Sequence, residues 1–320
     1  MIENMISNCL DQMPFRQCKC KDFLSPAGLC FEPEPSLGEG YYWYYEKPGY
    51  FAVSVMELKA KQDYIMEYKQ FDFISVNYYD RISAEELNPY KRLAANCIRG
   101  HVSNGELYRA RFHKNMPIKG TELILMPGFY NDYIEQKYPG QFTNPESAFM
   151  SVDGATDFPE LVLVLKQIGK FKGTGMAAEL YYESKVIEAL SLIIEKTKNN
   201  KNNSKEKRLT HQDNMNLEAV KSYIEDHFAF EIKAEQLADI GCMGQTKLRE
   251  SFKQAFGYTI TEYIQNRRIA HAEYLLLETD FNICQIAEAV GYHHAGRFSA
   301  LFKQNTGLLP EEYRKLLMKS

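Results

Sequence analysis

The sequence predicts an α+β protein of several domains, and two observations carry that prediction. First, the stretch from about Leu37 to Pro159 alternates apolar and polar residues and is rich in Tyr, Phe, Val and Ile, which is typical of strands. Second, helical periodicity takes over from about Phe158, and the last hundred residues contain an internal repeat. A chain of 320 residues can hold two or three such domains, at about 150 residues each.

Short β-rich segments follow one another in the N-terminal region, and we expect a small barrel or a double sheet. The clearest are GYFAVSVMELKA, KQDYIMEYKQFDFISVNYYD and ELYRARFHKNMPIKGTELILMPGFY. Turn signals at Asn115, Pro117 and Gly120 divide the last of these into two strands. We assign residues 1–160 to this domain.

Aromatic rings crowd these segments, above all the run Tyr41–Tyr45. Alternate residues of a strand face the same side, so some of these rings must face inward, where rings and hydroxyls would suit a flat or apolar ligand. The candidate lining residues are Trp43, Tyr45, Tyr64 and Tyr68. Arg109 and Arg111 share a face by the same alternation, and either could pair with a ligand carboxylate. The alternatives are rings that fill a core and arginines that are surface charges.

Two helical segments, FPELVLVLKQIGKF and TGMAAELYYESKVIEALSLIIEKTK, follow the strands. In the longer one Leu180, Ile187, Leu190 and Ile194 trace one apolar face. That helix is longer than a single barrel needs as cover, so residues 161–198 are interpreted as a dimerisation region. The alternative is a helix that packs on its own barrel.

A polar, Asn- and Lys-rich segment, NNKNNSKEKRLTHQD, occupies residues 199–213. Such a composition cannot bury enough apolar surface to offset the entropy of ordering, so we expect a linker. Residues 214–320 then form the last domain, with Leu217–Phe228 as a supporting helix. The lysines of the linker add positive charge beside that domain.

The internal repeat lies in this last domain, where LRESFKQAFGYTITEYI aligns with FSALFKQNTGLLPEEYR at an offset of fifty positions. Each copy has the pattern of a short helix, a turn and a second helix, which is the pattern of a helix-turn-helix. The helices are expected at Ala234–Ile240 and Gln245–Phe256, and again from Ile283 to Val290 and at His294–Thr306. Glycines Gly241, Gly257, Gly291 and Gly307 supply the helix ends and turns.

A segment without Gly or Pro, Thr259–Glu278, joins the two copies and predicts one long helix. A rigid helix fixes the distance between two recognition helices. Two such helices on one face of B-DNA must lie about 34 Å apart, one turn of the duplex.

These residues resemble the DNA-binding domain of the AraC/XylS family of transcription regulators, over about Leu217–Leu317. In the first half the resemblance is carried by Leu237, Ala238, Leu248, Phe252, Lys253, Phe256, Gly257, Tyr263, Ile264, Arg268, Ala272, Leu275 and Leu276. In the second half it is carried by Ile283, Ile286, Ala287, Val290, Gly291, Tyr292, Phe298, Ser299, Phe302, Lys303, Gly307, Pro310, Tyr313 and Arg314. One departure is Leu309, where the family usually has a capping Thr or Ser, at a cost of about 1 kcal/mol in stability.

The resemblance implies a sequence-specific regulator that binds double-stranded DNA, forms a homodimer and contacts RNA polymerase. It also implies a cupin-like sensor barrel that binds a small-molecule effector and no cofactor. The segments LMPGFYNDYI and YYESKVIEAL look most like the siderophore-responsive, PchR-type regulators, so a siderophore-like or other aromatic ligand is one candidate.

The exposed faces of the two second helices hold the candidate DNA contacts. By resemblance Thr246, Arg249 and Glu250 meet base edges, where arginine can pair with guanine and glutamate can accept from cytosine. Lys253 and Lys303 are candidate phosphate contacts. The remaining candidates are Gln245, His294 and Arg297. The second helix has few long polar side chains, so we expect it to specify fewer bases.

Cysteine usage leaves one alternative open, a DNA-binding module fused to a metal- or thiol-reactive sensor or repair enzyme. Its candidates are the early cysteines Cys9, Cys18, Cys20 and Cys30 among seven in the chain. Their spacing is not that of the common structural zinc sites, so free thiols and no metal are expected. Neither a paired-histidine motif nor a Gly-x-Ser-x-Gly motif occurs, so we do not expect an enzyme.

Charge and hydropathy complete the sequence-based picture. A formal net charge of −4 does not favour DNA binding, although the local distribution of charge matters more than the total. No apolar run is long enough to cross a membrane, and the first thirty residues lack the apolar core of a signal peptide. We therefore expect a cytoplasmic, nucleoid-associated protein.

Overall fold

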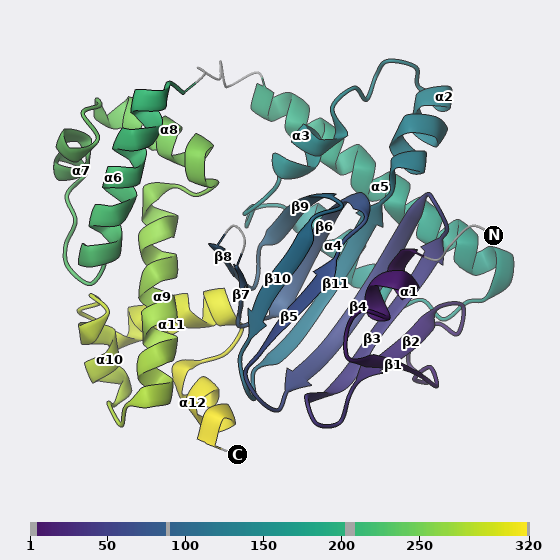
Figure 1. Cartoon of the computed structure of the whole chain (residues 1–320), viewed down its shortest axis with the longest axis horizontal. Coiled ribbons are helices and arrows are strands. Elements are labelled where there is room, and N and C mark those ends of the chain that lie inside the picture. Colours follow the sequence, from purple (N-terminus) through teal and green to yellow (C-terminus); the bar gives the residue numbers. More distant parts are fainter. Residues whose placement is uncertain (1–4, 88–89, 202–208, 319–320) are drawn as a thin grey trace. The chain divides into compact units, whose positions relative to one another are not determined.

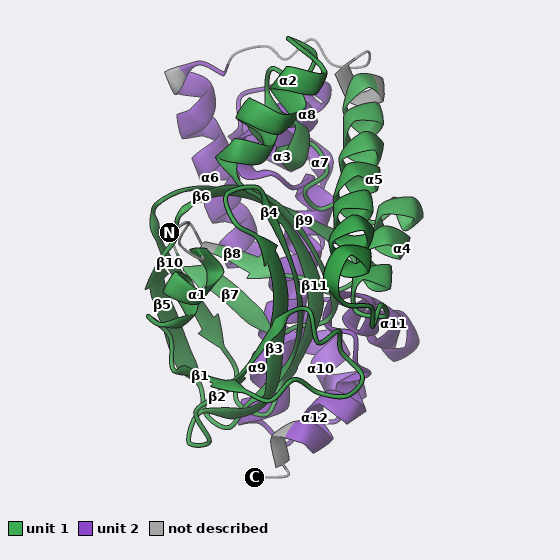
Figure 2. Cartoon of the chain, turned by 90° about the vertical axis from the view of Figure 1, so that its right-hand side faces the viewer, with its two compact units in different colours: residues 1–204 green, residues 205–320 purple. Residues whose placement is uncertain are grey.

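The computed structural model describes residues 5–87, 90–201 and 209–318, which fall into two compact units, residues 1–204 and 205–320 (Figures 1 and 2). Strands and a few helices make up the first unit, and helices alone are described in the second. A strand-rich N-terminal region followed by a helical tail confirms the predicted fold class at this level.

Two antiparallel sheets form the body of the first unit. In the larger sheet the strands run in the order β1 (Phe15–Cys18), β2 (Leu29–Pro33), β3 (Gly38–Lys47), β4 (Phe51–Ala60), β11 (Pro117–Leu125), β6 (Asp72–Arg81) and β9 (Ile98–Asn104). In the smaller sheet the order is β5 (Tyr64–Lys69), β10 (Leu107–Phe112), β7 (Ala84–Leu87) and β8 (Tyr90–Leu93). The β-branched and aromatic residues that predicted strands are the residues that pack between these layers.

Each face of the larger sheet has its own cover. One face packs on helices that follow the strands in sequence, and the other faces the smaller sheet and α1 (Met5–Leu10), as Figure 2 shows. The helices of the unit are η1 (Gly128–Ile134), α2 (Glu135–Lys137), α3 (Pro145–Met150), α4 (Pro159–Ile168) and α5 (Gly175–Lys201). The unit is therefore layered as helices, larger sheet and smaller sheet.

The two sheets do not close into one barrel through strand pairs among the described residues. The larger sheet ends at β1 and β9, and the smaller sheet ends at β5 and β8. Instead the sheets pack face to face, with Ile118 of the larger sheet and Phe112 of the smaller one buried in the same cluster. The prediction of a double sheet is confirmed, and the cupin-like barrel that the resemblance implied is not observed.

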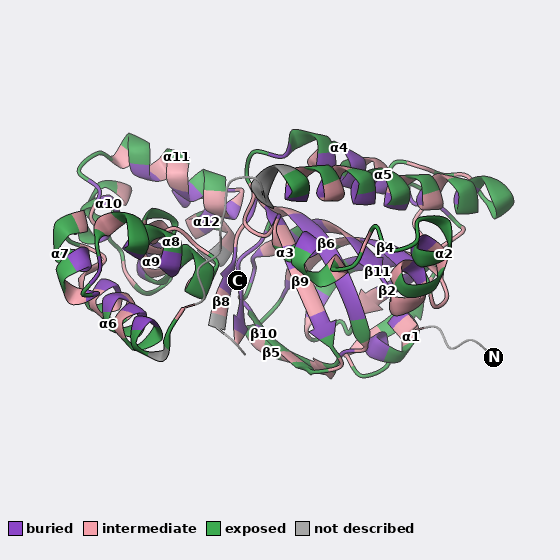
Figure 3. Ribbon diagram, turned by 90° about the horizontal axis from the view of Figure 1, so that it is seen from above, coloured by how far each residue is buried: buried purple, intermediate pink, exposed green. Residues whose placement is uncertain are grey.

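Helix α5 divides the apolar face that the sequence predicted for it. Leu190 is buried against the sheet and α4, together with Tyr182 and Val186. Leu180 and Ile187, by contrast, are 60% and 39% exposed, and Figure 3 shows that α5 carries both buried and exposed residues along its length. The predicted residues do share one side of the helix, but that side is not the buried one: Leu180 and Ile187, seven residues apart, point together toward solvent. The buried stripe of Tyr182, Val186 and Leu190 lies beside it and covers the sheet.

The predicted linker at residues 199–213 is shorter in the structure. Helix α5 continues to Lys201, and α6 (His211–His227) begins before residue 213. Thr210 caps α6, since its side chain accepts from the backbone N–H of Asp213 and the Asp213 carboxylate accepts from that of Thr210. This Thr-x-x-Asp pattern is a capping box of the kind that starts helices, and it was missed. Residues 202–208 lie outside the described residues.

Unit two consists of α6 and a series of helices that follow the predicted repeat. They are α7 (Ala234–Ile240), α8 (Gln245–Phe256), α9 (Ile260–Glu278), α10 (Ile283–Ala289), α11 (Ala295–Thr306) and α12 (Pro310–Met318). Helix α9 lies between the pair α7 and α8 and the pair α10 and α11 (Figure 1). Across the described residues no helix is both long and apolar enough to span a bilayer.

Candidate functional site

Helices α7 and α8 form the first helix-turn-helix. Leu237 of α7 packs with Leu248 and Phe252 of α8 in one buried cluster, which fixes the angle between the helices. The turn between them contains Cys242 at a φ of 48°, a left-handed conformation that non-glycine residues seldom adopt. Gly257, at a φ of 76°, ends α8.

Helices α10 and α11 form the second helix-turn-helix. Asn282 caps α10, and its side chain accepts from the backbone N–H of Gln285 at 2.9 Å. Gly291 lies in the turn with a φ of 84°, and a Cβ there would collide with the carbonyl oxygen of Ala229. Phe298 and Phe302 bury the inner face of α11, and Gly307 ends it at a φ of 80°.

The joining helix α9 is as the sequence predicted, with Thr259 as its N-cap in a capping box. Its 19 residues span about 28 Å at 1.5 Å per residue. The Arg268 guanidinium donates to the carbonyl oxygens of Phe228 at 2.7 Å, Phe230 at 2.9 Å and Gly291 at 3.0 Å. It thereby connects the end of α6 to the turn of the second helix-turn-helix.

The predicted DNA contacts lie on the outer faces of α8 and α11. Side chains that are exposed are Thr246, Arg249, Glu250, Lys253, His294, Arg297 and Lys303. Gln245 is half-buried and donates to Glu235 at 3.2 Å, so it is partly engaged within the unit. On α8 the exposed set offers donors, acceptors and positive charge on one helix face, which is what base readout and phosphate contact require.

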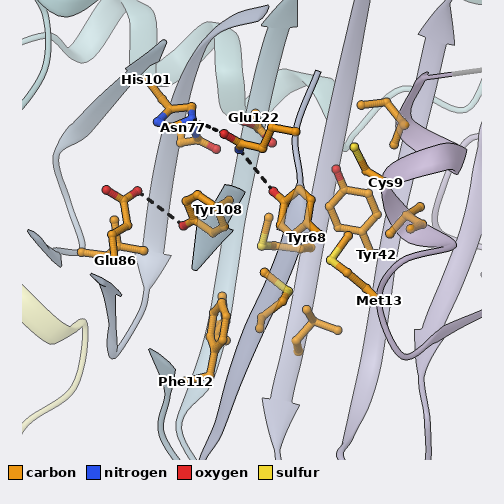
Figure 4. Close-up of a pocket in the computed structure, with 18 of the residues that line it drawn as sticks. Cys9, Met13, Tyr42, Tyr68, Asn77, Glu86, His101, Tyr108, Phe112 and Glu122 are labelled. Carbon is orange, nitrogen blue, oxygen red and sulfur yellow. Dashed lines mark hydrogen bonds between the residues drawn. The ribbon is translucent and has the colours of Figure 1, made fainter. Parts of the chain in front are cut away.

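The first unit contains a cavity of about 140 Å³ between its two sheets. Its apolar walls are Ile6, Leu10, Met13, Phe15, Met56, Leu58, Met66, Phe71, Phe73, Ile82, Leu93, Phe112, Ile118 and Ile124. Its other lining residues are Cys9, Tyr42, Tyr64, Tyr68, Gln70, Asn77, Tyr79, Glu86, Arg99, His101, Tyr108 and Glu122. Figure 4 shows Tyr42, Tyr68, Tyr108 and Glu122 around the same space. Apolar walls with a few convergent polar groups are typical of small-molecule sites.

Strand alternation divides the six predicted ligand contacts. Tyr64 and Tyr68 line the cavity. Trp43 and Tyr45 do not, because they project from the other face of β3, where both rings contact Tyr182 of α5. Side chains of β3 do alternate between the two faces, as expected, but the residue of this run that faces the cavity is Tyr42 and not Trp43 or Tyr45.

Arg109 and Arg111 also lie outside the cavity. On β10 the inward residues are Tyr108, Ala110 and Phe112, so the arginines between them face outward. Arg109 pairs with Glu67 at 2.7 Å on the exposed face of the smaller sheet, and Arg111 is exposed. Both arginines are therefore surface charges, which was the alternative interpretation of the sequence.

Most cavity residues that carry polar chemistry were missed from the sequence. Tyr42 and Tyr79 belong to runs of adjacent aromatic residues in which nothing marks the inward member. Tyr108 lies on the opposite face of β10 from Arg109 and Arg111, which were the residues expected to face inward. Glu122 had a usable signal: it is an acid directly before the apolar run Leu123–Leu125 within a strand, where an unpaired charge is costly.

The early cysteines are free thiols, and three of them lie near one another. Cys18 and Cys30 are cross-strand partners on β1 and β2, and Cys20 follows two residues later. Burial raises the pKa of Cys9 to about 11 and that of Cys30 to about 12, and burial also raises the pKa of Cys20. Thiols with raised pKa values are poor nucleophiles at neutral pH, because the thiolate is the reactive form. In the described part of the chain no cluster of His, Cys, Asp or Glu could hold a metal ion.

Comparison with known proteins finds similar sequences for the second unit. Residues 237–316 match the family model described as a helix-turn-helix domain. Over 101 residues the chain is 36% identical to the bifunctional transcriptional activator/DNA repair enzyme AdaA of Bacillus subtilis. Over 99 residues it is 32% identical to the transcriptional activator RhaS of an Enterobacter strain.

These matches are partial. Each covers 31% of this chain, and the chain spans 47% of the length of AdaA and 36% of that of RhaS. Among solved structures, the C-terminal domain of AraT from Geobacillus stearothermophilus is 30% identical, covering 34% of this chain and 88% of that one, with a TM-score of 0.31. The second unit thus contains a helix-turn-helix domain of the kind found in AraC-type regulators.

Proposed function

We propose that this protein is a sequence-specific, DNA-binding transcription regulator of AraC type. The observation that carries the proposal is the repeated helix-turn-helix, with an exposed polar face on α8 and on α11 and with α9 between the pairs. A helix-turn-helix places its second helix in the major groove, and α9, which joins the two copies, is about 28 Å long, against about 34 Å for one turn of the duplex.

Each recognition helix has a distinct part in this proposal. On α8, Thr246, Arg249 and Glu250 read base edges, and Lys253 contacts a phosphate. At the start of α11, the N-cap His294 and the helical residue Arg297 read fewer positions. Gly296 and Ala300, the neighbouring residues on the exposed side, have no side chain that can form a hydrogen bond.

The first unit supplies the control in this proposal. A small molecule enters the cavity between the sheets and alters how two protomers present their DNA-binding units to double-stranded DNA and RNA polymerase. For that, the ligand must bind one arrangement of the dimer more tightly than another. The sequence resemblance to siderophore-responsive regulators suggested a siderophore-like or other aromatic molecule as the effector.

The homodimer is proposed to form through the helices of the first unit. The outward stripe of α5 contains Met176, Leu180 and Ile187, and Leu163 of α4 is 57% exposed. Exposed apolar side chains gathered on neighbouring helices are typical of a subunit interface.

Binding of the full chain to promoter fragments, measured by fluorescence anisotropy, tests the proposal. Arg249→Ala should weaken binding to the specific fragment by about 1–3 kcal/mol and leave binding to random DNA nearly unchanged, because a base contact carries specificity. Arg16→Ala, which removes an exposed arginine of β1, is the charge-matched control and should leave both affinities unchanged. Equal losses on specific and random DNA would remove the base-reading role from Arg249.

A second function is favoured by the proximity of Cys18, Cys20 and Cys30 and by the likeness to AdaA, whose name includes DNA repair. In that case a cysteine would accept a group from damaged DNA. The raised thiol pKa values favour the regulator instead, so we expect no mass increase after exposure to methylated DNA. Stoichiometric methylation, detected by mass spectrometry, would favour the repair function.

A further inference from the structure

The cavity contains one carboxylate whose position is unusual for a sheet. Glu122 is the central residue of the inward face of β11, where its neighbours on the same face are Gly120 and Ile124. Its cross-strand partners are Ser54 on β4 and Asn77 on β6. An acidic residue in the middle of a sheet and between two packed layers is costly unless it has a partner, and such departures from pattern concentrate at functional sites.

The described residues around Glu122 supply its carboxyl group with hydrogen-bond donors but with no counter-charge. Burial raises its pKa, and hydrogen bonds from the side chains of Ser75 and Asn77 act in the opposite direction. Within residues 5–87, 90–201 and 209–318 no lysine, arginine or histidine forms an ion pair with it. The carboxylate therefore has donors but no counter-charge.

The other charges around the cavity balance one another. Arg99 pairs with Glu86 at 2.7 Å and with Asp153 at 3.0 Å, and Lys91 also pairs with Asp153. Two cations thus meet two carboxylates, and the Tyr108 hydroxyl donates to Glu86 at 3.4 Å. This cluster has no charge left over for Glu122.

The remaining titratable groups of the lining are neutral near pH 7. Burial lowers the pKa of His101 to about 4, so its imidazole is uncharged. Burial raises the pKa of the Cys9 thiol to about 11 and raises those of the tyrosine hydroxyls, which stay protonated. The tyrosines in question are Tyr42, Tyr64, Tyr68, Tyr79 and Tyr108. Once ionised, Glu122 leaves the cavity with a net charge of about −1.

Five tyrosines of the described chain share the cavity with this carboxylate. Tyr42, Tyr68 and Tyr79 line the same cavity as Glu122, and repulsion from Glu122 contributes, after burial, to the raised pKa of each phenol. The three come from β3, β5 and β6, so both sheets contribute, and Figure 4 shows Tyr42 and Tyr68 among the lining residues. Aromatic faces beside a carboxylate are a setting that stabilises an organic cation, by ion pairing and by cation–π attraction.

We propose that the cavity binds a small organic amine, whose ammonium group pairs with Glu122 among the tyrosines and whose apolar body lies against the Met, Leu, Ile and Phe walls. A volume of about 140 Å³ is close to the roughly 150 Å³ of an apolar cavity that holds benzene, so the ligand has about the size of one ring. This inference rests on the proposed ligand control and names its chemical class. It replaces the anionic ligand that Arg109 and Arg111 had suggested, because both arginines face outward. It also replaces the siderophore-like effector that the sequence resemblance suggested, because a cavity of about 140 Å³ holds about one ring.

Three ring compounds of similar size and different charge test the inference on the full chain. Isothermal titration calorimetry at pH 7 compares benzylamine, benzyl alcohol and benzoate. We expect benzylamine to bind tightest, by about tenfold or more over benzyl alcohol, because a charged hydrogen bond in a low-dielectric site exceeds a neutral one. Tighter or equal binding of benzyl alcohol or benzoate, or no binding of any of the three, would overturn the inference.

Two variants locate the binding. Glu122→Gln keeps the shape and removes the charge, and it should lower the affinity for benzylamine about 10- to 100-fold with little change for benzyl alcohol. Glu67→Gln, on the outward face of β5, is the matched control and should bind benzylamine as the unaltered protein does. An unchanged benzylamine affinity in Glu122→Gln would overturn the assignment.

Two further measurements separate the possible failures. Circular dichroism establishes that the variants fold, and if Glu122→Gln does not fold, the charge comparison on the unaltered protein still decides the inference. Anisotropy with promoter DNA, measured on the same preparations, decides the proposed regulator independently. A protein that binds promoter DNA but prefers a neutral or anionic ring would keep the function and lose the ligand class.

Discussion

The two helix-turn-helix copies share one inner design and differ on the outside. Phe252 and Phe302 occupy equivalent positions and are both fully buried. Outside, α8 presents Arg249 and Glu250, whereas the equivalent turn of α11 presents Ser299 and Ala300. Packing has kept the repeat recognisable, while the surface of each copy has its own chemistry. Variants at matched positions can therefore separate what the copies share from what they do not.

The largest effect is expected at the shared core. Phe302→Ala and Phe252→Ala should each lower the free energy of unfolding by about 3–5 kcal/mol, because each removes a fully buried ring and leaves a cavity. Urea denaturation followed by circular dichroism measures both. A loss below about 1 kcal/mol in one copy only would show that the shared packing does not extend to stability.

A smaller effect is expected on the differing surface. Arg297→Ala should weaken specific DNA binding by at most about 1–3 kcal/mol and alter preference at fewer base positions than Arg249→Ala does. Binding to a set of singly substituted promoter fragments measures both variants. If Arg297→Ala alters as many positions as Arg249→Ala, the two copies read DNA equally and the proposed asymmetry fails.

Glycines sharpen the comparison within α11. Gly307→Ala should destabilise the unit by about 1 kcal/mol, since Gly307 ends the helix at a φ of 80° that side chains rarely adopt. Gly296→Ala is the matched control: it lies inside the helix, nothing lies within 4 Å of an added Cβ, and alanine there should stabilise by about 0.5 kcal/mol. Thermal denaturation measures the change in stability of each variant. A change in the same direction for both variants would contradict the assigned roles.

The smallest effect concerns the first cap of each copy. Asn282 caps α10 through its side chain, whereas Lys233, the N-cap of α7, makes no side-chain cap hydrogen bond. Lys233→Asn should therefore stabilise the unit by about 0.5–1 kcal/mol, and Asn282→Ala should destabilise it by about 1 kcal/mol. Thermal denaturation compares the pair, and no gain from Lys233→Asn would mean that the α7 donors are already satisfied by other groups.

Sequence predicted the second unit closely. Helices α7 and α8 have the predicted bounds, and α9 starts one residue after its predicted first residue because Thr259 is the cap. Local signals explain this success, since glycine at a helix end and apolar spacing along one face are properties of short segments. The internal repeat also helps, because each copy shows the same helix and turn pattern and so supports the prediction for the other.

The first unit was predicted less well because its decisive features are not local. Alternation in the run Tyr41–Tyr45 separates two sets of side chains, but only the packing of α5 on one face decides that Trp43 lies under the helices and Tyr42 in the cavity. The surroundings of Glu122 likewise could not be predicted, because its cross-strand neighbours Ser54 and Asn77 are distant in sequence and adjacent only in the sheet.

The three carbonyl contacts of Arg268 have a consequence for the DNA. A planar guanidinium that holds the end of α6 and the turn at Gly291 leaves little rotational freedom between the two halves of the second unit. In the proposed regulator, a promoter whose half-sites are out of phase cannot be accommodated by bending the protein there. The duplex would have to twist or bend instead, so the flexibility of the base-pair steps between the half-sites would become part of what is recognised.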